Sequence, residues 1–377
     1  MRSDDLLKNV LMKATFIPAR PKRPVRRTEA VLAGEDSSRR VLDSPLKRSG
    51  VTTTLQKCSI FLYSVMGVFV LFSGCEQPFT PKGPYVQKLA VAGILSNTSD
   101  TQYVRVYKSY DPPGFDPYAV LEDQAIRGAA VTVSDGSSIV RYQESLIART
   151  DSGRFTDKIV AYAANHFRLQ PGGTYNLDVA TPSDGSAHST VTVPDTGWVT
   201  LLDPMMLSTS RVLDGTADDV VLQVGISSST AGYMVRFYLE YDLLQNSVWV
   251  RTRTEIPGLV VIIDTARYYG YPKLLRRSST PGAPHTLQRE GAYFMVRAYA
   301  EKLKDLRKQF GNDMWIRRGV FVLTQAETNL YTFFNIANGY QDAISIRLDM
   351  PDWTNINGGI GVFGAMVEDT LYVDIPN

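Results

Sequence analysis

Few side chains in this sequence are of the types that carry out catalysis or bind metals. Its 377 residues include three histidines and two cysteines, namely His166, His188, His285, Cys58 and Cys75. The histidine spacing matches no metal-binding motif, and no Gly-x-Ser-x-Gly nucleophile elbow occurs. His188 and Ser189 are neighbours in a predicted strand, where consecutive side chains point to opposite faces, so they do not form a catalytic dyad. The sequence therefore predicts no catalytic residue, no metal site, no cofactor and no enzymatic activity.

Two pairs of neighbouring carboxylates keep a hydrolase open as an alternative. Asp218–Asp219 and Glu368–Asp369 are of the residue type that glycoside hydrolases use. Such a site needs carboxylates from distant segments to meet across the substrate, and solvated loop charges are far commoner. An envelope hydrolase is accordingly the third-ranked function, behind two kinds of binding protein.

Cys75 ends an uncharged apolar run that begins at Cys58. The run reads CSIFLYSVMGVFVLFSGC, and Lys47, Arg48 and Lys57 precede it. A basic flank, an apolar core and small residues before the cleavage site are the parts of a secretory signal peptide. An uncleaved membrane anchor is the alternative, but it needs about 20 apolar residues. Only 17 residues separate Lys57 from Cys75, so the run favours a signal peptide over residues 51–74.

The end of this run resembles the bacterial lipobox. Ser73 and Gly74 are the small residues that the signal peptidase needs before the cysteine, and Phe72 departs from the usual smaller aliphatic residue. The resemblance implies cleavage before Cys75 and a diacylglycerol on its thiol. It also implies an outer-membrane lipoprotein of the cell envelope, which contacts the membrane through its lipid. Since Cys58 lies in the signal, no second cysteine remains for a disulfide.

The segments around the signal are polar. Residues 1–50 are basic and interrupted by prolines, as in a disordered segment, or they result from a mis-called start. Residues 1–74 hold 13 of the 40 Lys and Arg but only 6 of the 38 Asp and Glu, which leaves the part from Cys75 onward with a net charge of −5. The whole-chain basic charge therefore does not indicate a nucleic-acid partner. Residues 75–85 are proline-rich, which predicts a short tether.

Apolar residues at period two predict a β-sandwich for residues 86–197. The predicted strands include LAVAGIL from residue 89, YVRVYK from 103, AAVTV from 129, SIVRYQ from 138 and TYNLDV from 174. LQPGGTYNLDV, with Leu169 and Tyr175, resembles a corner of fibronectin type III and Ig-like domains. In those domains the tyrosine hydroxyl bonds back to the backbone. The fold class expected here is an Ig-like or fibronectin-like β-sandwich.

Residues 198–377 predict a second, β-rich domain with one or two helices. DVVLQVGI, YMVRFYLEY and SVWVRTR are strand-like, the last two joined in a hairpin through residues 244–246. The segment from Gly291 begins with strand alternation and ends with apolar residues at helical spacing, so both readings stay open. Thr324 and Glu327 form a predicted capping box for a helix that ends before Gly339.

The order of motifs in the chain is similar to that of an uncharacterised family of Bacteroidota lipoproteins, DUF4249. The motifs are the lipobox, LAVAGIL, GAAVTV, PGGTY and the closing NINGGIGVFGAMVEDTLYVDIP. The resemblance implies an envelope location, a β-rich fold and no known enzymatic residue. The glycines from Gly358 to Gly364 precede an apolar strand rather than a helix, which favours a close backbone approach over a phosphate-binding loop.

Two loops combine aromatic residues with prolines or basic residues, and we treat them as candidate partner-binding segments. The candidate residues are Phe115, Tyr118, Tyr268, Tyr269, Tyr271, Arg276 and Arg277. Exposed tyrosines next to cations suit protein contacts or sugar stacking. The alternative is that the three tyrosines from 268 to 271 pack on the core of the second domain.

The expected function is that of a lipid-anchored binding or accessory subunit in the cell envelope. Members of the resembled family are often found with TonB-dependent outer-membrane transporters, which implies an integral outer-membrane protein as partner. The alternative is a glycan-binding surface lipoprotein.

Overall fold

The computed structural model describes most of the chain from Tyr85 to Pro376. The described residues are 85–111, 123–148, 158–264, 266–278, 280, 282–338 and 353–376. From Gln87 onward they belong to one compact unit. The predicted signal peptide, Cys75, Phe115 and Tyr118 lie outside them. No helix in the described part is long and apolar enough to cross a membrane.

The described residues are mainly β-structure, as predicted, and the first of them form a sandwich. Its strands are β1 (Leu89–Ser96), β2 (Thr101–Lys108), β3 (Ala130–Ser134), β4 (Ile139–Ile147), β5 (Ile159–Asn165), β6 (Thr174–Ala180) and β7 (Ser186–Thr192). Strand β4 pairs with β5 through its last residues and with β3 through its first residues, so it passes from one layer to the other. Side chains from both layers share one core, for example Val91, Val104, Val131 and Leu177.

The predicted tyrosine corner is present in this sandwich. The Tyr175 side chain is 2% exposed, and its hydroxyl oxygen accepts a hydrogen bond of 2.9 Å from the backbone N–H of Gln170. The ring of Phe167 packs edge-on against Tyr175 at 5.7 Å between centroids. The Ig-like interpretation of LQPGGTYNLDV is therefore confirmed at the level of its hydrogen bond.

The last strand, β17 (Ile360–Asp374), belongs to both halves of the fold. Its first half pairs in parallel with β1, and its second half pairs antiparallel with β16 (Met314–Glu327). Phe363, Ala365 and Val367 of this strand lie in the core of the first sandwich. The end of the chain therefore completes the first sandwich, although the sequence assigned it to the domain 198–377.

Two glycines, one just before β17 and one at its start, allow this pairing. A Cβ added at Gly359 would lie 2.6 Å from the carbonyl oxygen of Leu89, and one at Gly361 would lie 2.0 Å from that of Val91. Gly361 also has φ of +119°, which side chains rarely adopt. The expected close backbone approach is confirmed, and its partner is β1.

Helix α5 (Thr328–Asn338) packs on the other face of β1 and β17, where Leu330 is fully buried. The predicted capping box is wrong at Thr324, which lies inside β16 and donates its hydroxyl to Glu368. Glu327 alone caps the helix, because its two carboxylate oxygens accept the backbone N–H groups of Asn329 and Leu330 at 2.6 and 2.7 Å. The strand continues through Thr324 because β10 and β17 pair with it on both sides.

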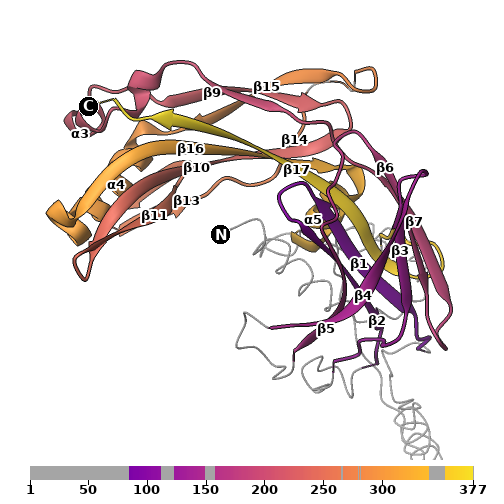
Figure 1. Cartoon of the computed structure of the whole chain (residues 1–377). Coiled ribbons are helices and arrows are strands. Elements are labelled where there is room, and N and C mark those ends of the chain that lie inside the picture. Colours follow the sequence, from indigo (N-terminus) through magenta and orange to yellow (C-terminus); the bar gives the residue numbers. More distant parts are fainter. Residues whose placement is uncertain are drawn as a thin grey trace, which may run out of the picture. The chain divides into compact units, whose positions relative to one another are not determined.

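A second sandwich follows, with the β17 end in one of its layers (Figure 1). That layer has the order β11 (Val248–Ile256), β10 (Thr230–Gln245), β16 and β17. The other contains β8 (Trp198–Leu201), β9 (Val220–Ser227) and β15 (Leu287–Phe294). Between them lies a core of aromatic and aliphatic residues that includes Phe237, Phe294, Tyr299 and Phe321. The shorter elements are the 3-10 helices η2 (Pro204–Leu207) and η3 (Gly311–Asp313), α3 (Thr209–Asp214) and the strands β12 (Leu259–Ile263), β13 (Ala266–Gly270) and β14 (Leu275–Arg276).

The segment from Gly291, for which the sequence allows a strand or a helix, contains both. Strand β15 ends at Phe294, and helix α4 (Val296–Phe310) begins two residues later. The carboxylate of Asp219 accepts the backbone N–H of Val296 at 2.7 Å, which satisfies a donor of the first turn of the helix. The predicted hairpin between β10 and β11 is confirmed, with positive φ at Asn246 and Ser247 in its turn.

Candidate interaction surface

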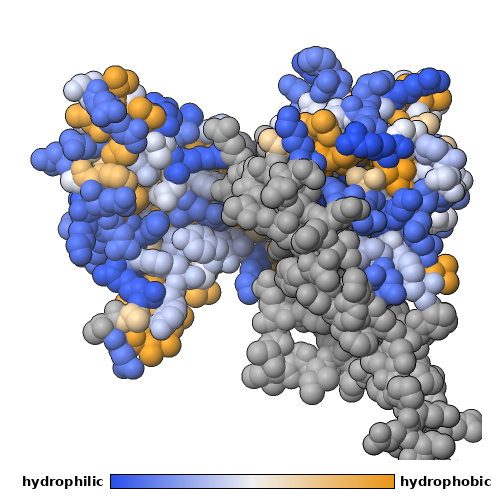
Figure 2. Space-filling view, turned by 90° about the horizontal axis from the view of Figure 1, so that it is seen from below, coloured by the Kyte–Doolittle hydropathy of each residue, from blue (hydrophilic) through white to orange (hydrophobic). Residues whose placement is uncertain are grey.

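The layer formed by β11, β10, β16 and β17 has one face in the core and one outside it. On β10, Phe237, Leu239 and Tyr241 point into the core of the second sandwich. Because strand side chains alternate, Tyr238, Glu240 and Asp242 point to the outer face. Most of the surface of the second sandwich seen in Figure 2 is hydrophilic, and apolar side chains gather in smaller groups.

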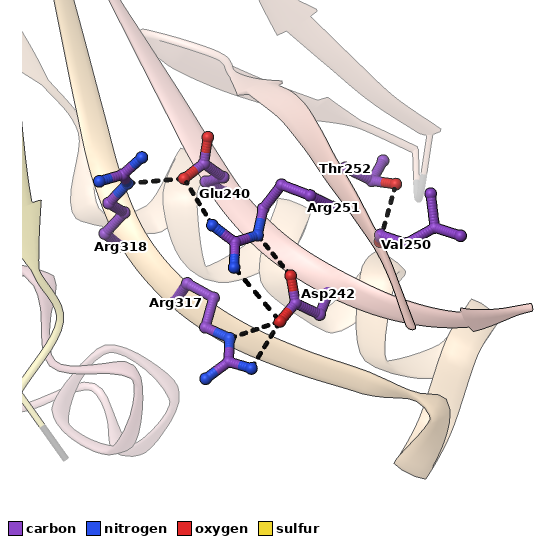
Figure 3. A network of polar contacts seen from close by, with 7 residues as sticks. All are labelled: Glu240, Asp242, Val250, Arg251, Thr252, Arg317 and Arg318. Atoms are coloured by element: carbon purple, nitrogen blue, oxygen red, sulfur yellow. Dashed lines mark hydrogen bonds and ion pairs between the residues drawn. The ribbon is translucent and has the colours of Figure 1, made fainter. Parts of the chain in front are cut away.

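An irregularity in β16 places two neighbouring arginines on this outer face. Glu240 of β10 is paired with Arg318 of β16, and the next residue of β10, Tyr241, is paired with Ile316. Arg317 therefore has no partner residue on β10. This is a β-bulge, which adds one residue to one strand and re-aims its side chains. Arg317 and Arg318 therefore both reach carboxylates of β10, as Figure 3 shows.

The carboxylates of Glu240 and Asp242 lie at the centre of an ion-pair network. Arg317 Nε and Nη2 are 2.6 and 2.5 Å from Asp242 Oδ2. Arg318 Nε is 2.6 Å from Glu240 Oε2. Arg251 of β11 donates from Nε to Asp242 Oδ1 and lies 3.6 Å from Glu240 Oε2 through Nη1. The hydrogen bond from Arg251 is the largest cause that lowers the pKa of Asp242, so this carboxylate is ionised at neutral pH.

Aromatic rings flank the network and orient its guanidinium groups. The guanidinium of Arg318 lies 4.2 Å from the ring centroid of Tyr372, and that of Arg317 lies 5.7 Å from that of Trp315. These distances are within the range of cation–π attraction. Arg253 stacks over Tyr238 at 4.8 Å in the same way. We call the set of Arg251, Arg253, Trp315, Arg317, Arg318 and Tyr372 the arginine face.

The cations of the arginine face are exposed, and the anions lie beneath them. The side chains of Arg251, Arg317 and Arg318 are 53%, 47% and 36% exposed, against 8% for Asp242 and 14% for Glu240. Trp315 and Tyr372 are 62% and 56% exposed. A binding partner therefore meets guanidinium groups and aromatic rings before it meets a carboxylate.

The candidate residues from 268 to 277 lie elsewhere and differ in their contacts. Tyr268 and Tyr271 are exposed, and Arg276 is exposed in β14. The Tyr269 hydroxyl donates to Asp305 of α4 at 2.7 Å. Arg277 donates from Nη1 to the backbone oxygen of Ser228 at 2.6 Å, and burial lowers its pKa. Tyr269 and Arg277 thus hold local structure, while the other three residues face solvent, and their role in binding a partner stays a prediction.

One cluster of described residues has the composition of a catalytic triad but not its order. The Ser227 hydroxyl donates to Asp195 Oδ2 at 2.9 Å, and His285 Nδ1 lies 3.0 Å from Asp195 Oδ1. In a triad the histidine lies between serine and aspartate and takes the serine proton. Here the aspartate lies between the other two, so the histidine does not contact the serine hydroxyl.

The predicted carboxylate pairs do not form a hydrolytic site with each other. Asp219 accepts the hydroxyl of Tyr293 and caps α4. Glu368 and Asp369 are consecutive in β17, where side chains alternate between faces, and they accept hydrogen bonds from Thr324 and Gly197 respectively. Among the residues that the structure describes, no group of His, Cys, Asp and Glu is arranged to hold a metal ion.

The arginine face was missed in the sequence, although part of its signal is there. The segment WIRRGVFVL from Trp315 has two consecutive arginines between apolar residues. Neighbouring side chains of a regular strand point to opposite faces, so one of two adjacent arginines would face the core unless a bulge re-aims it. The carboxylates that pair with these arginines lie more than 70 residues earlier, and only the pairing of β10 with β16 brings them together.

Comparisons with known proteins give a family and a set of solved structures. Residues 76–246 match the family model described as "Domain of unknown function (DUF4249)", which confirms the predicted family for these residues. No curated protein matches the chain.

Three solved structures are similar to parts of the chain. They are the Yersinia pseudotuberculosis adhesin InvE (13% identity, 63% of this chain and 56% of that chain, TM-score 0.16), the chicken CNTN1 FN1-FN3 domains (13%, 57% and 62%, TM-score 0.17) and DIP-gamma IG1+IG2 (8%, 65% and 92%, TM-score 0.16). The chain thus spans little more than half the length of the first of them.

Proposed function

We propose that this chain is a lipid-anchored, non-enzymatic binding subunit of the cell envelope. In this proposal a diacylglycerol on Cys75 holds it to the outer membrane, and it docks on an integral outer-membrane protein of the TonB-dependent transporter type. The observation that carries the proposal is the arginine face, an exposed sheet surface built from arginine, tryptophan and tyrosine.

The composition of this surface supports a protein contact. Tryptophan, tyrosine and arginine are the residues that most often dominate the energy of protein interfaces. Trp315 and Tyr372 are more than half exposed, and the arginines beside them are held by ion pairs on neighbouring strands. Ordered side chains lose little conformational entropy on binding, which favours affinity.

The polar clusters of the described residues offer less support for an enzyme. The Ser227, Asp195 and His285 cluster lacks a histidine next to the serine hydroxyl. An oxygen nucleophile needs such a base to become reactive. The binding function therefore accounts for more of the surface chemistry than a hydrolase does.

Purification from native membranes tests the proposal. Membranes of the host are solubilised in mild detergent, the tagged chain is recovered, and its migration on native gels is compared with that of Trp315→Ala and Tyr372→Ala variants. We expect an integral outer-membrane protein to co-purify with the wild type and to be lost from the variants. Ile139→Ala is the control, because Ile139 is also an exposed apolar residue, at 72%, but lies in β4 of the first sandwich. A wild-type chain that runs alone would refute the docking proposal.

The lipid anchor needs its own test. Cys75→Ala leaves no lipidation site in the predicted mature chain, so we expect an unprocessed precursor that incorporates no labelled fatty acid. Normal labelling of this variant would exclude Cys75 as the anchor.

A glycan-binding surface lipoprotein is the second candidate. The exposed rings of Tyr268 and Tyr271, 58% and 44% accessible, favour it because sugars stack on such rings. A glycan array distinguishes this candidate from the first. If the chain binds glycans, the wild type should bind sugars on the array, and the Tyr268→Ala and Tyr271→Ala variants should lose that binding.

A further inference from the structure

The arginine face has hydrogen-bond donors that its own carboxylates do not use. Arg318 bonds to Glu240 through Nε, and Arg317 bonds to Asp242 through Nε and Nη2. Among the described residues, Arg317 Nη1 and the two terminal nitrogens of Arg318 donate no hydrogen bond. Figure 3 shows the Arg318 terminal nitrogens directed away from the two carboxylates.

These donors are presented in a fixed orientation. The guanidinium of Arg318 is held by Glu240 on one side and by the ring of Tyr372 at 4.2 Å on another. The guanidinium of Arg317 is held by Asp242 and lies over Trp315. A guanidinium offers paired N–H groups that match the two oxygens of a carboxylate. Two adjacent guanidiniums held in this way suit a ligand with more than one anionic group.

The contacts of the rings distinguish between possible ligands. Sugar stacking needs an open aromatic face, whereas Tyr372 and Trp315 each have a guanidinium near one face. Charge recognition by the arginines is therefore better supported here than stacking. A second copy of the chain is also a poor partner. If two arginine faces met, Arg251 and Arg317 of one copy, both about half exposed, would lie against the arginines of the other, and like charges repel.

We infer that the arginine face binds an acidic polypeptide segment of the docked partner, through side-chain carboxylates that accept hydrogen bonds from Arg317 and Arg318. This inference rests on the proposed docking function and assigns the chemistry of its contact. The carboxylates of Glu240 and Asp242 stay in place beneath the arginines and keep them oriented. The sheet, the bulge and the two rings therefore form the support of an anion-binding surface.

Binding of a defined acidic peptide tests the inference on the full mature chain in mild detergent. The probe is a fluorescently labelled peptide of about ten glutamates, compared with a glutamine peptide of the same length at low salt and at about 0.15 M salt. We expect only the glutamate peptide to bind, and to bind more weakly as salt rises. Arg317→Gln and Arg318→Gln should each weaken it about tenfold, because each removes one charge-assisted contact.

Two further variants separate recognition from damage. Arg317→Lys keeps the charge but loses the paired donors, so we expect an intermediate loss of affinity and an unchanged melting temperature. Arg289→Gln removes an exposed arginine from β15, outside the arginine face, and should leave binding unchanged. Asp242 retains Arg251 as a partner in every Arg317 variant, which protects the fold.

The possible outcomes either overturn the inference or separate it from the docking function. Equal binding of the two peptides, or an equal loss with Arg289→Gln, would exclude recognition by Arg317 and Arg318. Binding to anionic lipid vesicles in place of the glutamate peptide would assign the face to a membrane surface. If the outer-membrane partner co-purifies with Arg317→Gln as well as with the wild type, the docking function stands and this chemistry fails. If no partner co-purifies but the arginine variants lose the peptide, the docking function fails and the anion-binding surface stands.

Discussion

Replacing Phe363 with alanine tests whether the last strand is part of the first sandwich. Phe363 has no exposed surface and lies in the core of that sandwich. Its ring reaches β1 at Gly93, where an added Cβ would lie 3.2 Å from Phe363 Cδ2. Removing a buried phenylalanine side chain costs about 3–5 kcal/mol, since apolar burial is lost and a cavity remains. Many domains have a free energy of unfolding of only about 5–15 kcal/mol, so Phe363→Ala is expected to lose a large part of it.

Urea denaturation followed by circular dichroism measures the loss, and hydrogen exchange locates it. The amides of β6 and β7, in the layer opposite β17, should exchange faster in Phe363→Ala than in the wild type. Tyr372→Ala is the control on the same strand. Tyr372 is 56% exposed, so its removal should cost about 1 kcal/mol or less and leave exchange in β6 and β7 unchanged.

A fragment experiment gives the same reasoning a second test. Residues 85–201 contain β1 to β8 but lack β17, so the core of the fragment loses Phe363 and Val367 and β1 loses its parallel partner. We expect this fragment to be unfolded alone and to gain β-structure when a peptide of residues 353–376 is added. If the fragment folds without the peptide, or if Phe363→Ala unfolds at the same urea concentration as the wild type, the assignment of the last strand to the first core is refuted.

Three smaller predictions follow from single contacts. Tyr175→Phe removes the acceptor of the Gln170 N–H, and the unpaired donor should lower the free energy of unfolding by about 1–3 kcal/mol in urea titrations; an unchanged value would mean that water replaces the hydroxyl. Burial raises the pKa of Glu327 to about 7 from 4.5, so the folded state binds a proton more tightly and stability should fall as pH rises from about 4.5 to about 7. Glu327→Gln should remove that slope, and a slope that persists would assign it to another group. Gln325→Ala should lower the melting temperature by several degrees, because its buried side chain accepts from Ser227 N and Thr230 Oγ1; an unchanged melting temperature would contradict that role.

Local patterns predicted the parts of the fold that depend on neighbours in sequence. The apolar run LAVAGIL becomes β1, which is buried on both faces because the first core lies on one side and α5 on the other. The tyrosine corner was also predictable, since donor and acceptor are five residues apart. In both cases the chemistry of a short segment decides its structure.

Local patterns failed where a distant strand decides. Thr324 and Glu327 have the spacing of a capping box, but Thr324 is paired with Met234 on one side and Glu368 on the other. Two strand partners outweigh a cap, whose contribution is about 1 kcal/mol. The helix therefore begins later, and Glu327 has a different role from the one expected.

Most of the arginine face could not be predicted from the sequence, for a related reason. Its ion pairs join β10, β11 and β16, and the bulge at Arg317 is a property of the register between two strands. A sequence shows that arginines and carboxylates are present, but not which of them face the same side of a sheet. The sequence points instead to the loop from 268 to 277, because its tyrosines and basic residues are adjacent in the chain.

The position of β17 also bears on what the family match covers. The matched residues, 76–246, end in the turn after β10 and contain neither β16 nor β17. Within the matched stretch, β1 has β2 as its partner, and its parallel partner arrives more than 260 residues later. β10 likewise pairs with β11 and β16, which both follow the matched stretch. The matched stretch therefore contains the start of two sandwiches and completes neither, so the arginine face and the core of the first sandwich both depend on the strands that come after it.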